Sequence, residues 1–173
     1  MGNPIPDRIA WAIDTMEIAP TDRVLEIGCG NGTAVAVLAD RLPDCSIVAI
    51  DRSEKMIRSA IQRNREAVSL GRVQFHQASL NEMDAGQPPF DAIFAINVNL
   101  FWMEPAVEWS EMKTLLRPDG TVYLFNQPPS ASKMQEIADR TSANLTAAGF
   151  AVKEVRVSGH HPVPAVCVIA KRI

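Results

Sequence analysis

The sequence predicts an α/β fold in which a doubly wound, mostly parallel seven-stranded sheet has helices on both faces and ends in an antiparallel C-terminal hairpin. Short apolar runs alternate with longer segments whose apolar residues recur at helical spacing, which is typical of parallel strands joined by crossover helices. The run FDAIFAI at 90–96 is typical of a central strand covered on both faces. Roughly seven residues separate the last two runs, too few for a crossover helix, so these should pair antiparallel.

The predicted elements follow one another without a repeat or a dividing linker. Strands are predicted at residues 24–27, 47–50, 73–75, 90–96, 121–126, 150–157 and 165–170. Helices are predicted over about residues 5–18, 32–42, 54–68, 105–116 and 134–148. Ser53 should cap the third helix, whose inner face includes Ile61, and Gly149 should end the last one. Residues 79–89 are expected to form a loop or a short helical turn, and RPDG at 117–120 a turn before the fifth strand.

Length and composition indicate one globular domain over residues 21–173, with residues 1–20 as an N-terminal helix available as a lid. The net charge of −3 gives no basic surplus, so no nucleic-acid partner is expected. No apolar run approaches the roughly 20 residues that span a bilayer, and the start does not resemble a signal peptide, so we expect no membrane insertion. Three cysteines without metal-type spacing favour reduced thiols, no metal site and a cytoplasmic protein.

The stretch VLEIGCGNGTA at 24–34 places a glycine-rich loop directly after the first predicted strand. The dinucleotide pattern G-x-G-x-x-G/A fits poorly, because Thr33 stands at its last position. The pattern E-x-G-x-G-x-G matches from Glu26 to Gly32. A carboxylate beside the loop would repel a pyrophosphate but suits a ligand whose local charge is positive, such as a sulfonium or an α-ammonium group. The loop therefore favours a cationic ligand.

Asp51 ends the second predicted strand, 21 residues after Gly30. A carboxylate at this position can accept two hydrogen bonds from the vicinal hydroxyls of a ribose. Folds that bind NAD share this feature, so by itself it indicates an adenosine ribose and no more. The alternative is an acid that only caps the helix beginning near Ser53. Together with the glycines, the ribose interpretation is favoured.

With these residues in view, the sequence resembles the class I S-adenosylmethionine-dependent methyltransferases. The resemblance rests on VLEIGCGNGT followed by VAIDRSEKMI, and it extends to FDAIFAINVNLFW and LLRPDGTVYLFN. The predicted terminal hairpin resembles the reversed seventh strand of that family. The similarity covers the chain from about Thr21 onward and implies that S-adenosylmethionine is the cofactor.

The resemblance also implies roles for individual residues. Glu26 would orient the loop and the ammonium group of the cofactor through water, and the loop from Gly28 to Gly30 would pass under the methionine moiety. Asp51 would hold the ribose hydroxyls. Met56 would lie near the adenine, with packing in the core as its alternative. The implied cofactor-binding residues are Glu26, Gly28, Cys29, Gly30, Asn31, Gly32, Asp51, Arg52, Met56, Ser79, Leu80, Asn97 and Val98.

Ser79 departs from the family pattern. Members often have an aspartate in the loop after the third strand that bonds the adenine amino group, whereas this chain reads FHQASL. A serine can still accept a hydrogen bond, but without charge, and the backbone amide of Leu80 could contact a ring nitrogen. Binding with a weaker adenine contact is expected.

The sequence indicates less clearly which residues would bind the methyl acceptor. Trp102 follows the fourth strand and would line an acceptor pocket or cover the core. His160 and His161 lie in the loop between the last two strands, where an imidazole would bind the acceptor, act as a base or simply be solvated. The motif D/N-P-P-Y/F is replaced by NVNLFW after the fourth strand, which disfavours nucleobase amines. No catalytic base is identified.

The sequence therefore predicts methyl transfer from S-adenosylmethionine to a small-molecule acceptor by in-line displacement. Because the chain carries no large insertion, either the acceptor is small or the site is open to a larger partner through homo-oligomerisation. One alternative is a protein that binds the cofactor without transferring the methyl group. Another, an NAD-dependent oxidoreductase, is disfavoured by Glu26, Thr33 and the terminal hairpin.

Overall fold

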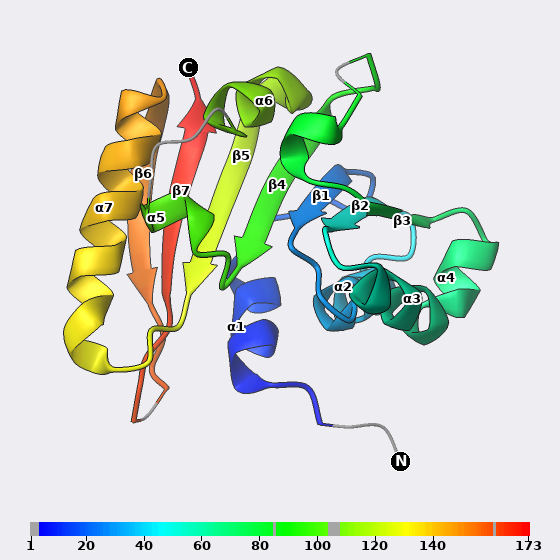
Figure 1. The fold of residues 1–173 in the computed structure, drawn as a ribbon, viewed down its shortest axis with the longest axis horizontal. Coiled ribbons are helices and arrows are strands. Elements are labelled where there is room, and N and C mark those ends of the chain that lie inside the picture. The colour runs from blue at the N-terminus through cyan, green and yellow to red at the C-terminus, as the bar shows by residue number, and fades with distance from the viewer. Residues whose placement is uncertain (1–3, 85, 104–107, 161) are drawn as a thin grey trace.

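The structure, a computed structural model, describes residues 4–84, 86–103, 108–160 and 162–173 and contains the predicted mixed sheet (Figure 1). The strand order is β3-β2-β1-β4-β5-β7-β6, which confirms a seven-stranded sheet in these residues. The strands from β1 to β5 pair parallel with one another, whereas β7 pairs antiparallel with both β5 and β6. The strands are β1 Arg23–Ile27, β2 Ser46–Asp51, β3 Val73–Gln77, β4 Phe90–Ile96, β5 Leu116–Asn126, β6 Phe150–Val157 and β7 Val166–Arg172.

Helices cover both faces of the sheet. Apolar side chains of α1, α2, α3 and α4 pack against one face, and those of η1, α5, α6 and α7 pack against the other. In the described ranges, no helix is long and apolar enough to cross a membrane. The helical elements are α1 Asp7–Thr15, α2 Thr33–Arg41, α3 Glu54–Arg63, α4 Arg65–Ser69, η1 Leu80–Glu82, α5 Leu100–Met103, α6 Glu108–Leu115, η2 Ala131–Lys133 and α7 Met134–Ala147.

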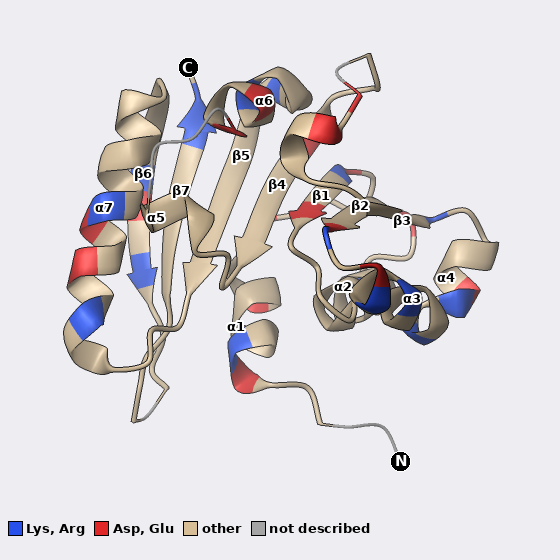
Figure 2. Ribbon diagram, viewed as in Figure 1, with Lys and Arg blue, Asp and Glu red and all other residues tan. Residues whose placement is uncertain are grey.

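The carboxyl edge of the sheet lies beside α1. The ends of β4 and β5 point toward this helix, and the connection from β6 to β7 is at the same edge (Figure 1). Charged residues lie mainly on helices and toward the ends of strands, so the middle of β4, β5 and β7 is uncharged (Figure 2). Glu26, inside β1, is an exception that is 3% exposed. Ligands of such sheets bind at the carboxyl edge, so this edge is where a site is expected.

The predicted helix over residues 54–68 is divided into α3 and α4 at Asn64. The buried amide of Asn64 donates to the carbonyl oxygens of Gly32 (3.0 Å) and Ala60 (2.9 Å), which fixes the break against the glycine loop. Ile61 is 40% exposed, so its predicted place on the inner face is wrong. Ala60 occupies the inner face instead, and the next residue is turned about 100° away from it.

The region before the fifth strand also differs from the prediction. β5 begins at Leu116, so residues 117–120 belong to an extended segment and the predicted turn is wrong. The pairing of β4 and β5 shifts register between Phe90 and Ala92, which accommodates the extra residues. The short helix α5 was not predicted, and the first part of the helix predicted over 105–116 lies outside the described residues.

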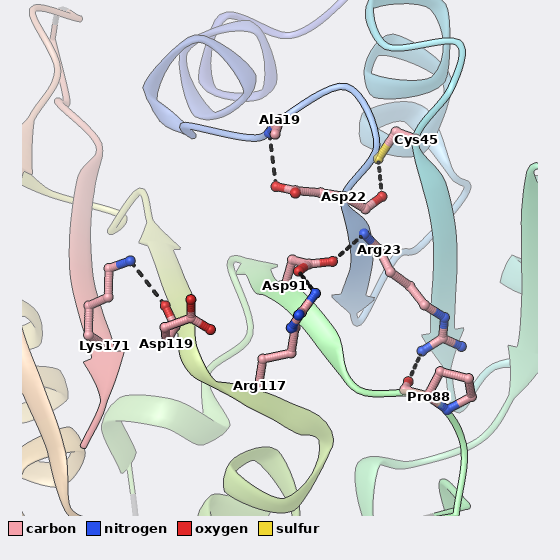
Figure 3. Close-up of polar contacts among 9 residues, drawn as sticks. All are labelled: Ala19, Asp22, Arg23, Cys45, Pro88, Asp91, Arg117, Asp119 and Lys171. Carbon is pink, nitrogen blue, oxygen red and sulfur yellow. Dashed lines mark hydrogen bonds and ion pairs between the residues drawn. The ribbon is translucent and has the colours of Figure 1, made fainter.

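Polar contacts fasten the amino edge of the sheet, opposite the expected site (Figure 3). Asp91 at the start of β4 accepts from the backbone of Arg23 (2.8 Å) and pairs with Arg117 of β5 (2.7 Å). Lys171 of β7 donates to the carbonyl oxygen of Asp119 at 3.1 Å. Because these groups bond to one another, they join four strands of the sheet at this edge.

Candidate active site

The glycine loop turns from β1 into α2 beneath the end of β4. Backbone amides of Gly28 (2.8 Å) and Cys29 (3.0 Å) donate to the carbonyl oxygen of Ile50 at the end of β2. Gly28 has a φ of +71°, and a Cβ there would lie 2.6 Å from Cγ2 of Val98. Gly30 has a φ of +53°, and a Cβ added to it would meet no heavy atom within 4 Å, so it borders open space. The loop thus needs glycine for conformation and for close approach.

Glu26 is a buried carboxyl group beside this loop. Its Oε2 atom has no hydrogen-bond partner in the part of the chain that the structure describes. Burial, together with the nearby charge of Asp51, raises the pKa of Glu26 to about 8. An unpaired buried acid is costly, and a positively charged ligand group would relieve that cost. The arrangement fits the cationic ligand that the sequence predicts.

Asp51 is held between the glycine loop and the start of α3. Its Oδ2 accepts from the amide of Gly30 and its Oδ1 from the amide of Ser53, both at 2.9 Å. The N-cap of α3 is Ser53, whose hydroxyl accepts from the amide of Met56 at 3.3 Å. Asp51 is therefore not the cap of that helix. Each carboxylate oxygen retains a further lone pair for a ligand hydroxyl.

Two cavities meet at Gly28, which lines both. The larger, of about 370 Å³, contains six of the predicted cofactor residues, namely Gly28, Asp51, Arg52, Ser79, Leu80 and Val98. The smaller, of about 170 Å³, contains six as well, namely Glu26, Gly28, Cys29, Gly30, Asn31 and Asn97. The structure thus brings together side chains from the ends of β1, β2, β3 and β4 at one edge.

Several cavity residues were missed by sequence reasoning. Arg8 and Ile9 reach the smaller cavity from α1, and Asn99, Leu100 and Glu108 line the larger one. The packing of α1 and α6 over the sheet brings Arg8, Ile9 and Glu108 there, and no local motif marks these three. Asn99 and Leu100 directly follow the predicted site residues Asn97 and Val98, so their place in the sequence could have indicated them.

Ser79 is engaged in local contacts. Its hydroxyl lies 2.5 Å from Oδ1 of Asn81 and 2.5 Å from Oε2 of Glu82, and its amide donates to the same Glu82 oxygen at 2.7 Å. These hydrogen bonds hold the pKa of Glu82 below its usual value. The hydroxyl proton of Ser79 is thus shared with the turn that begins η1.

Other predicted residues lie outside the two cavities. Met56 and Trp102 are half-buried and line neither, and Gly32 is buried at the N-cap of α2. His160 is at the carboxyl edge, where its ring contacts that of Trp11 edge-on with centroids 6.3 Å apart. The Nδ1 atom of His160 is buried and has no hydrogen-bond partner among the described residues. His161 lies outside the described residues.

Comparisons with known proteins find similarity to methyltransferases. The family model of a methyltransferase domain matches residues 24–120. The chain is 25% identical to the uncharacterized methyltransferase YdaC of Bacillus subtilis, over 94% of this chain and 90% of that protein. It is 33% identical to a trans-aconitate 2-methyltransferase of Azoarcus sp. over 82% of its own length, but spans only 56% of that relative.

Solved structures share the fold. A SAM-dependent methyltransferase from Aquifex aeolicus superposes with a TM-score of 0.78 at 19% identity, covering 98% of this chain and 91% of the other. A geranyl diphosphate methyltransferase in complex with SAM gives a TM-score of 0.72 at 13% identity, covering 96% and 85%. At these identities the similarity concerns the arrangement of the backbone.

Proposed function

The chain belongs to the class I S-adenosylmethionine-dependent methyltransferases, and on this premise we propose that it moves the methyl group of that cofactor to a small-molecule acceptor. The observation that carries the proposal is the Oε2 atom of Glu26 beside the glycine loop, which has no hydrogen-bond partner among the described residues. The carboxylate of Asp51 lies in the adjoining cavity. Glu26 suits an ammonium group, and Asp51 suits the hydroxyls of a ribose. A pyrophosphate would meet the negative charge of Asp51 and would not favour ionisation of the buried Glu26.

The larger cavity would hold the adenosine part of the cofactor. Asp51 is fixed by two backbone amides and would accept hydrogen bonds from both ribose hydroxyls. Arg52 follows it and would lie beside the adenine. The cavity is lined largely by apolar side chains such as Ile50 and Leu100, which suit the faces of a purine.

The smaller cavity would hold the methionine part. The carboxyl group of Glu26 would meet the ammonium group, because Glu26 lines this cavity together with Arg8 and Ile9 of α1. The guanidinium of Arg8 lines the same cavity and forms no ion pair with any residue in the described ranges, so it is available for the cofactor carboxylate. The amino end of the α2 helix dipole adds partial positive charge nearby.

S-adenosylmethionine supplies an activated methyl group on a sulfonium, so the protein has mainly to align the acceptor and exclude water. Asn97 and Val98, at the junction of the two cavities, would border the methyl group. Asn97 has a φ of +57°, unusual for a residue other than glycine, and its Oδ1 accepts from the amide of Gln127 at 2.7 Å. This bond ties the loops after β4 and β5 together and supports the strained conformation.

Acceptor binding would involve α1 and the loop after β6. Trp11 packs edge-on against Phe125 with ring centroids 5.6 Å apart and also contacts His160. The C-terminal part of α1 is fastened by an ion pair between Asp14 and Arg41 and by a 3.1 Å bond from Arg156 to the carbonyl of Thr15. An anchored α1 would act as a lid that leaves room for a small acceptor. The named substrates of the relatives, trans-aconitate and geranyl diphosphate, agree with that size.

Calorimetric titration tests the proposal. S-adenosylhomocysteine should bind the protein, and NAD should not. Binding of NAD without binding of S-adenosylhomocysteine would overturn it. Release of the methyl group from S-adenosylmethionine should then be screened against a panel of small-molecule acceptors, which separates a transferase from a protein that only binds the cofactor.

A further inference from the structure

On the basis of the proposed function, the larger cavity would bind the adenine of the cofactor. Adenine carries a 6-amino group, and a donor of this kind needs an acceptor when it enters a cavity that excludes water. Among its described lining residues, four side chains have an oxygen that can accept a hydrogen bond, those of Asp51, Ser79, Asn99 and Glu108. Asp51 and Ser79 are already engaged, and of the other two only Glu108 offers a carboxylate, which is the stronger acceptor.

Asp51 receives one backbone hydrogen bond on each oxygen, and its remaining lone pairs are those assigned to the ribose. The hydroxyl of Ser79 is 2.5 Å from both Asn81 and Glu82, so it serves the turn at η1. Glu82 itself faces a separate groove on the β3 side and does not line the larger cavity.

Glu108 is not engaged in hydrogen bonds of this kind with the described residues. It is the first residue of α6, it is half-buried, and its carboxylate forms no hydrogen bond or ion pair with any described residue. α6 packs against η1, and Trp109 shares an apolar core with Leu80. This packing places Glu108 in the lining of the cavity that Ser79 and Leu80 also line.

We propose that Glu108 accepts a hydrogen bond from the 6-amino group of the adenine. The chain would then recognise the purine from α6, with a charged acceptor, and the neutral Ser79 would be free to cap η1. Glu108 lines only the larger cavity, whereas the loop atoms around Glu26 and Asn97 line the smaller one. Its position therefore assigns it to the adenosine and not to the acceptor.

The test uses two ligands that differ at the purine. S-inosylhomocysteine has a 6-oxo group in place of the 6-amino group, and a carboxylate repels that oxygen. The wild-type protein should bind S-adenosylhomocysteine at least about tenfold more tightly than the inosine analogue. In Glu108→Gln the amide can also donate, so the two affinities should come within about threefold of each other. Glu108→Ala should bind S-adenosylhomocysteine about tenfold more weakly than the wild type.

Glu111→Gln is the matched control, because Glu111 is one turn further along α6, is half-buried and does not line the cavity. It should keep the wild-type preference, and thermal melting should show all variants folded. An unchanged preference in Glu108→Gln, or equal weakening of both ligands, would overturn the assignment of Glu108 while leaving the proposed function intact. Failure of the wild-type protein to bind S-adenosylhomocysteine would overturn both proposals.

Discussion

The backbone amide of Gly30 donates a 2.9 Å hydrogen bond to Oδ2 of Asp51, so the loop after β1 and the acid that ends β2 hold each other in place. The second carboxylate oxygen is fixed by Ser53. A side chain held on both oxygens loses little conformational freedom when a ligand arrives, so its interaction with a ribose is strengthened. The contact also makes the loop sensitive to substitutions on the neighbouring strand.

Replacing Asp51 with alanine should weaken binding of S-adenosylhomocysteine by about 2–4 kcal/mol, because two charge-assisted hydrogen bonds to the ribose and the support of Gly30 are lost. Isothermal titration calorimetry measures the change. Asp40→Ala, at an exposed position on α2, is the control and should bind as the wild type does. An unchanged dissociation constant for Asp51→Ala would show that the residue only orders the backbone.

Binding should release a proton from Glu26. At pH 7 the side chain is mostly protonated, since burial raises its pKa to about 8, and an ammonium group in contact favours the ionised form. Titrations at pH 7 in buffers of different ionisation enthalpy should therefore report close to one proton released per S-adenosylhomocysteine bound. The Glu26→Gln variant should release none from this site. Equal proton release from both proteins would contradict the role of Glu26.

Glu26 should also make the ligand-free protein less stable as the pH rises. The unfolded chain loses the proton near the ordinary pKa of 4.5, while the folded chain keeps it until about pH 8. The free energy of unfolding therefore falls across this window, and that loss is absent in Glu26→Gln. The melting temperature of the variant relative to the wild type should increase between about pH 5 and pH 8, on the order of 10 °C. A constant difference would argue against the raised pKa.

Two glycines of the loop should respond differently to alanine. Gly28→Ala should lower the free energy of unfolding by roughly 1–3 kcal/mol, because its Cβ meets Val98 at 2.6 Å in a left-handed conformation. Gly30→Ala has only the conformational cost, about 1 kcal/mol, but places a methyl group in the ligand space. Urea unfolding and ligand titration separate the two effects. Adding Val98→Ala to Gly28→Ala should restore part of the stability, and no restoration would contradict the steric explanation.

The fold and the core of the candidate cofactor site follow from local sequence patterns. The loop from Glu26 to Gly32 and the acid at the end of β2 are identified by spacing, because consecutive elements of a parallel sheet place their carboxyl ends at one edge. Arg8 and Glu108 could not be found in this way. Each lies on a helix whose position over the sheet depends on packing between distant segments, so no local pattern links either residue to the loop.

Errors in the predicted elements have a similar cause. The break at Asn64 arises because its side chain bonds to the carbonyl of Gly32, which is 32 residues away in the chain. The early start of β5 depends on pairing with β4 across a register shift. Helical periodicity and turn residues describe a segment in isolation and contain neither contact.

The contacts of Asp91 with Arg23 and Arg117 lie at the end of the sheet away from the cavities. The proposed acceptor site and these contacts therefore involve different sets of residues. On the proposed function, mutations around α1 and the loop after β6 would alter the choice of acceptor while the opposite edge continues to join the strands. An engineer could strengthen that edge first and then diversify the other, with the stabilised sheet tolerating substitutions that the natural protein would not.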